Sequence, residues 1–381
     1  MTMPRLRARM PARMRLSDLL GGRVAYRNLE PADRAIRGLS QIRGEIGLPD
    51  GFIPRKTSPA YAAAIVHFLG QAQEMRGARG PLRRLLFIGD TRMNDGKAAA
   101  NLSQHLPLQG FIGADRLDED PHTEIEDFLM ISNRWTALED FAAWAASGGI
   151  PIDESTALMI DMDKTMIGAR GRNDKVIDAA RVEAVRTVIE ETLGESFDEV
   201  AFRAVYDRLN QPTYHSFSRD NQDYLAYISL MVVGGVCLAK QMWDDLHNGR
   251  LSTFEEFVAL CYDRRSRMSG GLLEVHQEVA ARLAVGDPTP FKRFRYREYT
   301  CTVSRMDLLP GDASQEEVLE NEIVITGEVV ELAQDMIARG VLTFGISDKP
   351  DEASIPSPEL ADQGYLPLHQ VFMKVLTSPT T

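Results

Sequence analysis

The chain has 381 residues, 44% of them hydrophobic, and a net charge of −12. This length exceeds one typical domain, so we expect two domains, or one core with a large insertion. The acidic total argues against nucleic acid and anionic membranes as partners, because both attract basic surfaces. No segment has the roughly 18 consecutive apolar residues of a membrane span. The three cysteines, Cys237, Cys261 and Cys301, lie far apart in sequence, without metal-ligand spacing or a disulfide framework. A reducing cytoplasm is the expected location.

The first 16 residues carry five arginines and no acidic residue. They lack the apolar stretch of a secretory signal, so we expect a disordered basic arm, with an organelle-targeting segment as the alternative. Leucine and isoleucine at roughly helical spacing then predict a surface helix over 28–46.

A lysine precedes the next predicted helix. Lys56 stands before a turn, Thr57 to Pro59, that can cap an alanine-rich helix of about four turns. After a short linker, 85–88 predicts an apolar strand, and Asp90 and Asp95 stand in the loop that follows it.

A second strand is expected at 110–114, after a helix that begins near Gly96. A connection this short between two strands is typical of a parallel crossover. Asp90 and Asp95 therefore lie at the carboxyl end of a strand. We expect residues 115–156 to form a polar, helical connection with its own small core.

The most informative stretch is 157–165, ALMIDMDKT. Its apolar run is typical of a parallel strand covered on both faces, and open α/β sheets bind ligands at the carboxyl ends of such strands. Asp161 and Asp163 would each disfavour the charge of the other unless a cation lay between them. This predicts a hard divalent ion, most simply Mg²⁺. The alternative is an ordinary strand end whose aspartate caps the next helix.

From 168 to 340 the periodicity is helical, and no strand is convincing. The clearest helices are expected at 174–193, 197–209, 221–246, 253–268 and 271–285. A long helical insertion directly after the aspartate loop predicts a lid. Its basic clusters, 263–267 and 292–297, are expected to be solvated faces. Arg170 and Arg172 lie closer to the expected opening and are better candidates for binding an anionic substrate.

The last segment repeats the pattern of a helix followed by a strand. A helix at about 327–339 ends at Gly340, and the strand 341–346 leads into Ser347. Residues 369–376 predict a final edge strand. We therefore expect an α/β fold, with a Rossmann-like parallel sheet and an inserted all-helical cap. The expected regions are an N-terminal arm and helix (1–50), the first part of the core (51–168), the cap (169–339) and the second part of the core (340–381).

The strand ends together supply the groups that phosphoryl transfer requires. A nucleophilic carboxylate can attack phosphorus and form an aspartyl phosphate. A second carboxylate two residues on can protonate the leaving oxygen and then activate water. A hydroxyl and a lysine can hold the phosphoryl oxygens, and Mg²⁺ bound by the remaining acids offsets their charge. The candidate residues are Asp161, Asp163, Asp90, Asp95, Ser347 and Lys56.

These residues resemble the motifs of the haloacid dehalogenase (HAD) superfamily, which is dominated by Mg²⁺-dependent phosphatases. Asp161, Asp163 and Thr165 match its first motif, DxDxT; Ser347 resembles the second, Lys56 the third, and Asp90 with Asp95 the fourth. Familiar members carry these motifs in the order first to fourth, whereas here the order is third, fourth, first, second. A circular permutation accounts for this order, because domain termini are often close together. The resemblance still implies the family's sheet order, 5-4-1-2-3, with the strands of Asp90 and Asp161 parallel and adjacent.

The resemblance also implies the roles of the residues. Asp161 would be the nucleophile, Asp163 the general acid and base, and Thr165 a support for the loop. Asp161, Asp163 through its backbone carbonyl, and Asp90 or Asp95 would bind Mg²⁺. Lys349, Lys374 and Lys97 compete with Lys56 as the phosphate-binding lysine, and Lys164 is expected to be a solvated loop charge.

The expected function is that of a cytoplasmic Mg²⁺-dependent phosphatase acting on a small phosphorylated metabolite. A phosphotransferase or phosphomutase would use the same site with water excluded. A non-catalytic phosphate-binding regulatory protein is a further alternative, although it would have little use for the Asp163 side chain. A Rossmann-type nucleotide-binding protein is disfavoured, because no GxGxxG follows any predicted strand.

Overall fold

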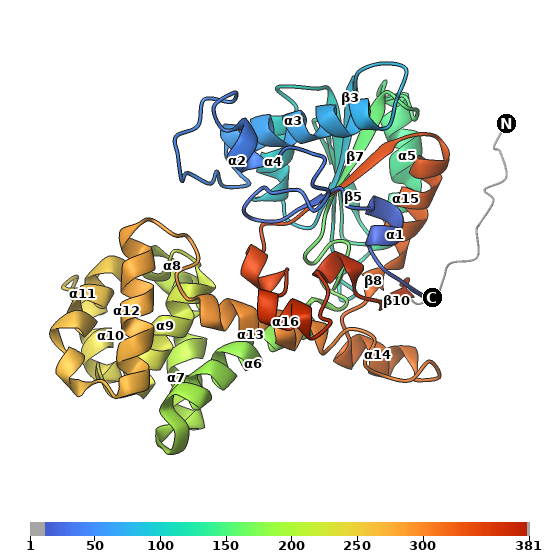
Figure 1. The fold of residues 1–381 in the computed structure, drawn as a ribbon. Coiled ribbons are helices and arrows are strands. Elements are labelled where there is room, and N and C mark those ends of the chain that lie inside the picture. Colours follow the sequence, from blue (N-terminus) through green and yellow to red (C-terminus); the bar gives the residue numbers. More distant parts are fainter. Residues whose placement is uncertain (1–11, 379–381) are drawn as a thin grey trace. The chain divides into compact units, whose positions relative to one another are not determined.

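The computed structural model describes residues 12–378, and its fold is shown in Figure 1. Contacts between residues divide the chain into two units. The core unit holds the chain up to Asp178, residues 302–355 and the chain from Glu359 onward; the helical unit holds 179–301 and 356–358. The helical unit is shorter at both ends than the expected cap. No helix within the described residues has both the length and the apolar character needed to cross a bilayer.

A seven-stranded, mostly parallel sheet forms the centre of the core unit, which confirms the α/β class. In spatial order its strands are β2 (Val24–Ala25), β9 (Leu342–Ile346), β7 (Thr156–Asp161), β3 (Arg84–Gly89), β4 (Leu108–Gly113), β6 (Leu129–Ser132) and β5 (Thr123–Glu126). Every residue of β7 is buried, as expected of a central strand covered on both faces. The β5–β6 pair is antiparallel, and the other described pairings in this sheet are parallel.

The strands that precede the candidate site residues are neighbours, as predicted. Strand β7 pairs in parallel with β3 on one side and with β9 on the other. Ile160 of β7 is opposite Ile88 of β3, and Asp161 is opposite Ile346 of β9. The carboxyl ends of all three strands therefore lie at one edge of the sheet.

The N-terminal region differs from the prediction in two ways: it contains a short strand that was not predicted, and its predicted helix is shorter. Strand β2 pairs in parallel with β9, and the expected helix over 28–46 is reduced to α2 (Leu39–Ile42). The predicted edge strand within 369–376 exists as β10 (Met373–Leu376), but it belongs to a separate sheet, β1-β10-β8, with β1 at Arg13–Met14 and β8 at Ile325–Thr326. The expected disordered arm falls mainly on residues 1–11, outside the described residues, and from Arg13 the chain is in a strand.

The connection 115–156 is not purely helical. It contains the β5–β6 hairpin, whose strands are joined by Asp127 in the left-handed conformation (φ 51°) and by Phe128. Half of the β5 residues, TEIE, are exposed, so the segment carries no strong apolar pattern. The aromatic side chains after it pack on Phe111 of β4, with ring centroids of Trp135 and Phe141 at 6.1 and 5.9 Å. They therefore extend the main core and do not form a core of their own.

Helices cover both faces of the main sheet (Figure 1). On one face the buried side chains of α3 and α4 pack with those of alternate strand residues, and Phe68 of α3 stacks on Phe344 of β9 at 6.5 Å. Helices α5 and α15 lie on the other face. The helices of the core unit are α1 (Ser17–Leu20), α2, α3 (Pro59–Met75), α4 (Asp95–Leu102), α5 (Leu138–Ser147), α14 (Gln315–Asn321), α15 (Gly327–Ala338) and α16 (Pro358–Asp362), whose first residue is assigned to the helical unit.

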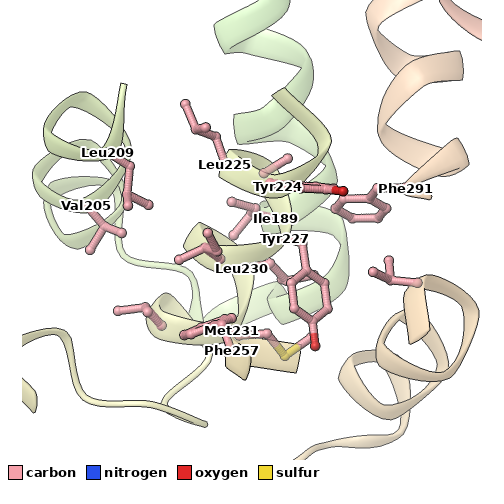
Figure 2. Packing of buried hydrophobic residues seen from close by; sticks show 14 of the residues in the cluster. Ile189, Val205, Leu209, Tyr224, Leu225, Tyr227, Leu230, Met231, Phe257 and Phe291 are labelled. Carbon is pink, nitrogen blue, oxygen red and sulfur yellow. The ribbon is translucent and has the colours of Figure 1, made fainter. Parts of the chain in front are cut away.

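The helical unit is built around α9, whose residues from Asp223 to Val232 are all buried. Figure 2 shows the side chains of this core, among them Tyr227, Leu230 and Met231 of α9 with Phe257 of α11. Its helices are α6 (Asp174–Leu193), which begins in the core unit, α7 (Glu199–Leu209), α8 (His215–Ser218), α9 (Gln222–Val233), α10 (Ala239–His247), α11 (Phe254–Asp263), α12 (Gly270–Ala284) and α13 (Lys292–Val303), which ends in the core unit.

Two predictions for this region are corrected. The expected helix 221–246 is interrupted after Val233, because Gly235 adopts a positive φ of 74° that ends the helix. The basic cluster 292–297 is not simply a solvated face, because Arg295 is buried and bound to the carboxylates of Asp223 and Glu298.

Candidate active site

Three aspartates from two neighbouring strand ends meet in a buried cluster, which we call the aspartate triad. Asp161 is the last residue of β7, Asp90 follows β3, and Asp95 begins α4. All three are buried, and one carboxylate oxygen from each lies within 4.8 Å of the others. Carboxylates at this distance can share one ion. The predicted adjacency of Asp90 and Asp95 to Asp161 is therefore confirmed.

The loop after β3 fixes Asp95 through backbone donors. Its Oδ2 accepts hydrogen bonds from the backbone N–H of Asp90 at 3.1 Å and of Thr91 at 2.8 Å, and from the Thr91 hydroxyl at 2.8 Å. Gly89 leaves the space that this arrangement needs, because a Cβ built there would lie 2.5 Å from the Cβ of Asp95. The five-residue spacing of Asp90 and Asp95 thus has a local structural cause.

Lys56, which lies outside the sheet, binds two carboxylates of the triad. Its Nζ donates to Oδ1 of Asp95 and to Oδ1 of Asp161, at 2.5 Å each, and the residue is 6% exposed. The turn after it begins α3, where the Ser58 hydroxyl accepts from the backbone N–H of Tyr61 and Pro59 is the first helical residue. The helix start therefore sets the position of Lys56.

The competing lysines lie in other surroundings. Lys374, on β10, donates to the carbonyl of Leu309 at 2.7 Å and to Glu322 at 2.6 Å. Lys97 is exposed on α4. Lys349 is buried, and its backbone N–H donates to the Ser347 hydroxyl at 3.1 Å. The direct contacts with two carboxylates of the triad favour Lys56.

Burial and mutual repulsion disfavour full ionisation of the triad. Burial raises the pKa of Asp161 well above its ordinary value, against the opposing charge of Lys56. Burial and the Asp95 carboxylate raise the pKa of Asp90 to about 7, although Arg170 opposes them. Asp95 behaves differently. Burial alone would raise its pKa, but the charge of Lys56 and the hydrogen bonds that Asp95 accepts outweigh burial and lower the pKa of Asp95 to about 2. A further cation would stabilise the charged forms of Asp90 and Asp161.

The donor set of the triad fits a hard divalent cation. Three carboxylates supply oxygen ligands, and Mg²⁺ prefers such ligands in proteins. Among the described residues, the carboxylate of Asp163 is not a member of this group, although it was expected to share the ion. A metal-binding role of its side chain is therefore not supported. The roles that remain predictions for Asp163 are metal binding by its backbone carbonyl and acid and base chemistry by its side chain.

The chain turns sharply after Asp161. The Asp161 carbonyl accepts from the N–H of Met166 at 3.2 Å, and Lys164 adopts a positive φ of 64°. Thr165 is fully buried, and its carbonyl accepts from the Thr326 hydroxyl at 2.6 Å, so it is well placed to support the loop. Lys164 is not a solvated charge as expected, because its Nζ binds both carboxylate oxygens of Asp178 at 2.9 and 2.8 Å.

Ser347 lies at the end of the strand next to Asp161. It follows β9, is 2% exposed, and donates its backbone N–H to the carbonyl of Ala25 at 3.0 Å. Since Ile346 is opposite Asp161, Ser347 lies at the same edge of the sheet as the triad. The next residue, Asp348, forms an ion pair with buried Arg27, a partner that the sequence analysis missed.

The two arginines after the aspartate loop have different surroundings. Arg170 Nε donates to Oδ2 of Asp90 at 2.5 Å, and its side chain is 36% exposed, so it borders the triad. Arg172 is 5% exposed and binds Asp115 at 2.8 Å and both oxygens of Glu328 at 2.9 and 3.0 Å. Its donors are thus engaged by buried carboxylates, and the structure gives Arg172 a structural role in place of the expected substrate contact.

Tyr61 is a buried polar residue near the triad that the sequence analysis did not select. It lies in the first turn of α3, is 2% exposed, and its hydroxyl has no hydrogen-bond partner among the described residues. Burial raises its pKa, so the hydroxyl keeps its proton. Its position five residues after Lys56, at a predicted helix start, was the available signal.

Comparisons of the chain with protein-family models, with curated proteins and with solved structures returned no match.

Proposed function

We propose that this protein is a cytoplasmic, Mg²⁺-dependent phosphatase of the HAD type, which hydrolyses a small phosphorylated metabolite through an aspartyl phosphate. The observation that carries the proposal is the aspartate triad bound to Lys56 at the carboxyl ends of two adjacent parallel strands. A purely structural role explains this cluster poorly, because buried like charges destabilise a fold unless a ligand or cation offsets them.

The roles proposed for the chain's residues are those that the resemblance to the HAD motifs implies. Asp161 attacks the phosphorus atom with a carboxylate oxygen and forms the aspartyl phosphate. Lys56 stabilises the charged form of Asp161 before the attack and the phosphoryl oxygens after it, and the Ser347 hydroxyl binds a phosphoryl oxygen. Asp163 protonates the leaving oxygen and later takes a proton from the attacking water. When bound by Asp161, Asp90 or Asp95 and the Asp163 carbonyl, Mg²⁺ supplies positive charge against the phosphoryl group.

The sheet order supports the permuted arrangement. In the sheet, five neighbouring strands have the spatial order β4-β3-β7-β9-β2. The strand before Asp90, β3, therefore lies on one side of the Asp161 strand, β7, and the strand before Ser347, β9, lies on the other side. This is the neighbour pattern that the family order 5-4-1-2-3 requires, with β2 in the third position. The strand that takes this position comes from the N-terminal region, so the permutation would open the chain between the second strand of the family order, β9, and the third, β2.

The test is hydrolysis of p-nitrophenyl phosphate with and without Mg²⁺ by the wild type and three variants. We expect metal-dependent turnover that falls at least about a thousandfold in Asp161→Asn, because the nucleophile is lost. Asp163→Asn should lose at least about a hundredfold in kcat, the scale of general acid catalysis, while Mg²⁺ binding measured by calorimetry stays within about threefold.

The matched control is Asp140→Asn, which removes an exposed carboxylate on α5, a helix that carries no residue of the triad. Its activity should equal that of the wild type. Activity that survives in Asp161→Asn, or wild-type activity that ignores Mg²⁺, would contradict the proposal. An equal loss of Mg²⁺ binding and turnover in Asp163→Asn would reassign that residue to the metal site.

A further inference from the structure

Two cysteines that are distant in sequence meet inside the helical unit. The Sγ atoms of Cys237 and Cys261 are 3.9 Å apart, and the residues are 1% and 0% exposed. Cys261 lies on α11, and Cys237 lies in the linker between α9 and α10. All three cysteines are free thiols, which agrees with the absence of a disulfide framework in the sequence, but the spacing gave no sign that these two lie so close together.

Cys237 lies outside the regular helices, and its backbone N–H donates to the carbonyl of Met231 at 3.3 Å. The linker contains Gly235, with φ 74°, and a Cβ on Gly235 would meet no atom within 4 Å. The neighbouring Leu238 is 64% exposed, so the linker lies close to the surface. A disulfide needs an Sγ–Sγ distance of about 2 Å. The two sulfur atoms must therefore approach each other by about 2 Å for the bond to form.

The surroundings of the two thiols differ, and the difference divides their roles. A hydrogen bond from Cys261 and the charges of Arg264 and Arg267 lower the pKa of Cys237 to about 7, against the effect of burial. The same hydrogen bond, with burial, raises the pKa of Cys261. Thiolates are the nucleophilic form of cysteine, so Cys237 is the reactive partner.

Neutral groups line the rest of this site. Tyr227, which lies beside Phe257 in the helical core (Figure 2), keeps its proton because burial raises its pKa. Its hydroxyl is 2.6 Å from Nδ1 of His276, whose pKa is lowered by burial. The charged groups acting on Cys237 are therefore the two arginines, and both favour its thiolate.

We propose that Cys237 and Cys261 form a thiol–disulfide redox site whose oxidant is a hydroperoxide. The Cys237 thiolate attacks the distal peroxide oxygen, the O–O bond breaks, and Cys237 becomes a sulfenic acid while the leaving oxygen takes a proton as water or an alcohol. The Cys261 sulfur then attacks the Cys237 sulfur, and the S–O bond breaks with loss of water. Two thiols are oxidised by two electrons, and one peroxide is reduced. The site is independent of the proposed phosphatase function.

The experiment oxidises the full-length, reduced chain with hydrogen peroxide under native conditions and then alkylates the remaining thiols. We expect a product with one alkylated cysteine, Cys301, and a peptide map with an intramolecular Cys237–Cys261 link that dithiothreitol reverses. The link closes a loop across 24 positions and restricts the unfolded chain, so the oxidised protein should also have a higher Tm.

Variants separate this site from unspecific oxidation. Cys301→Ser, the matched control, should form the link at the wild-type rate. In Cys261→Ser a sulfenic acid should accumulate at Cys237 and be trapped by dimedone, whereas Cys237→Ser should give no adduct at Cys261. Arg264→Ala should slow the oxidation severalfold, and Arg264→Lys, which keeps the charge, should slow it less.

Three outcomes would overturn the proposal. The first is full alkylation of all three cysteines after a peroxide exposure that oxidises N-acetylcysteine. The second is a link that involves Cys301. The third is equal dimedone trapping at Cys237 and Cys261 in the two single variants, which would remove the division of roles.

Discussion

At the scale of single residues, Gly89 is the position where one added carbon is most informative. A Cβ there would lie 2.5 Å from the Cβ and 2.6 Å from the Cγ of Asp95, a distance that real contacts do not reach. In Gly89→Ala, Asp95 must therefore move, and it would lose hydrogen bonds that the Asp90 and Thr91 backbone donates to it. For the proposed magnesium site we expect the Mg²⁺ affinity, measured by calorimetry, to fall about tenfold or more, as for changes to groups that orient metal ligands.

The control for this prediction is Gly80→Ala, since a Cβ on Gly80 meets nothing within 4 Å. It should bind Mg²⁺ as the wild type does. If Gly89→Ala also retained wild-type affinity, Asp95 would not be a ligand, and Asp90 and Asp161 would have to hold the ion without it.

At the scale of elements, Arg172 connects three segments of the core unit. Its guanidinium binds Asp115 after β4, Glu328 at the start of α15 and the hydroxyl of Ser378 near the C-terminus. Replacing it in Arg172→Met leaves two buried carboxylates without their cation. We expect a loss of about 3 to 5 kcal/mol in the free energy of unfolding, measured by urea titration, which is the scale for breaking a buried ion pair from one side.

The comparison variant is Arg116→Met, whose side chain is 64% exposed and pairs with Glu119 on the surface. Its stability should change by less than about 1 kcal/mol. If Arg172 contacted the substrate after all, Arg172→Met would instead raise KM strongly with little change in the urea midpoint.

Sequence patterns predicted those elements whose pattern is local and strong. The buried run of β7, the helix start after Lys56 and the helix 174–193 appear where the periodicity placed them. Strand β2 was missed because it has only two residues, Val24 and Ala25, and is defined by its pairing with β9. The β5–β6 hairpin was missed because its outer strand, TEIE, alternates exposed residues with half-buried glutamates, so it lacks a buried apolar face, and because it lies at the sheet edge.

The candidate site shows the same limit. The clustering of Asp90, Asp95 and Asp161 was predictable, because parallel strand ends share one edge of a sheet. The burial of Arg172, and the meeting of Cys237 with Cys261, depend on contacts between distant segments that no spacing in the sequence encodes. Side-chain partners across long separations therefore required the structure.

At the scale of the whole molecule, the beginning and the end of the described chain are joined through the core unit. Arg13 and Met14 pair with Lys374 and Met373, and the Tyr26 hydroxyl lies 3.0 Å from Nδ1 of His369, 343 positions away. His369 is 1% exposed, and burial lowers its pKa to about 4. The folded protein therefore keeps this imidazole neutral at a pH where an unfolded chain, with an ordinary histidine pKa near 6.5, would protonate it.

This difference predicts a loss of stability in acid. Above about pH 6.5 both states carry a neutral His369 and its contribution is fully present; between pH 6.5 and 4 the unfolded state binds the extra proton, so the free energy of unfolding falls. From pH 7 to 5 the loss from this residue is about 2 kcal/mol. Urea midpoints followed by circular dichroism at the two pH values should show it in the wild type and in His105→Gln, an exposed control. In His369→Gln this part of the pH dependence should disappear. If the free energy of unfolding of this variant depended on pH as in the wild type, His369 would have to be protonated or solvated in the folded protein. The contact between the two ends of the chain would then tolerate a charge.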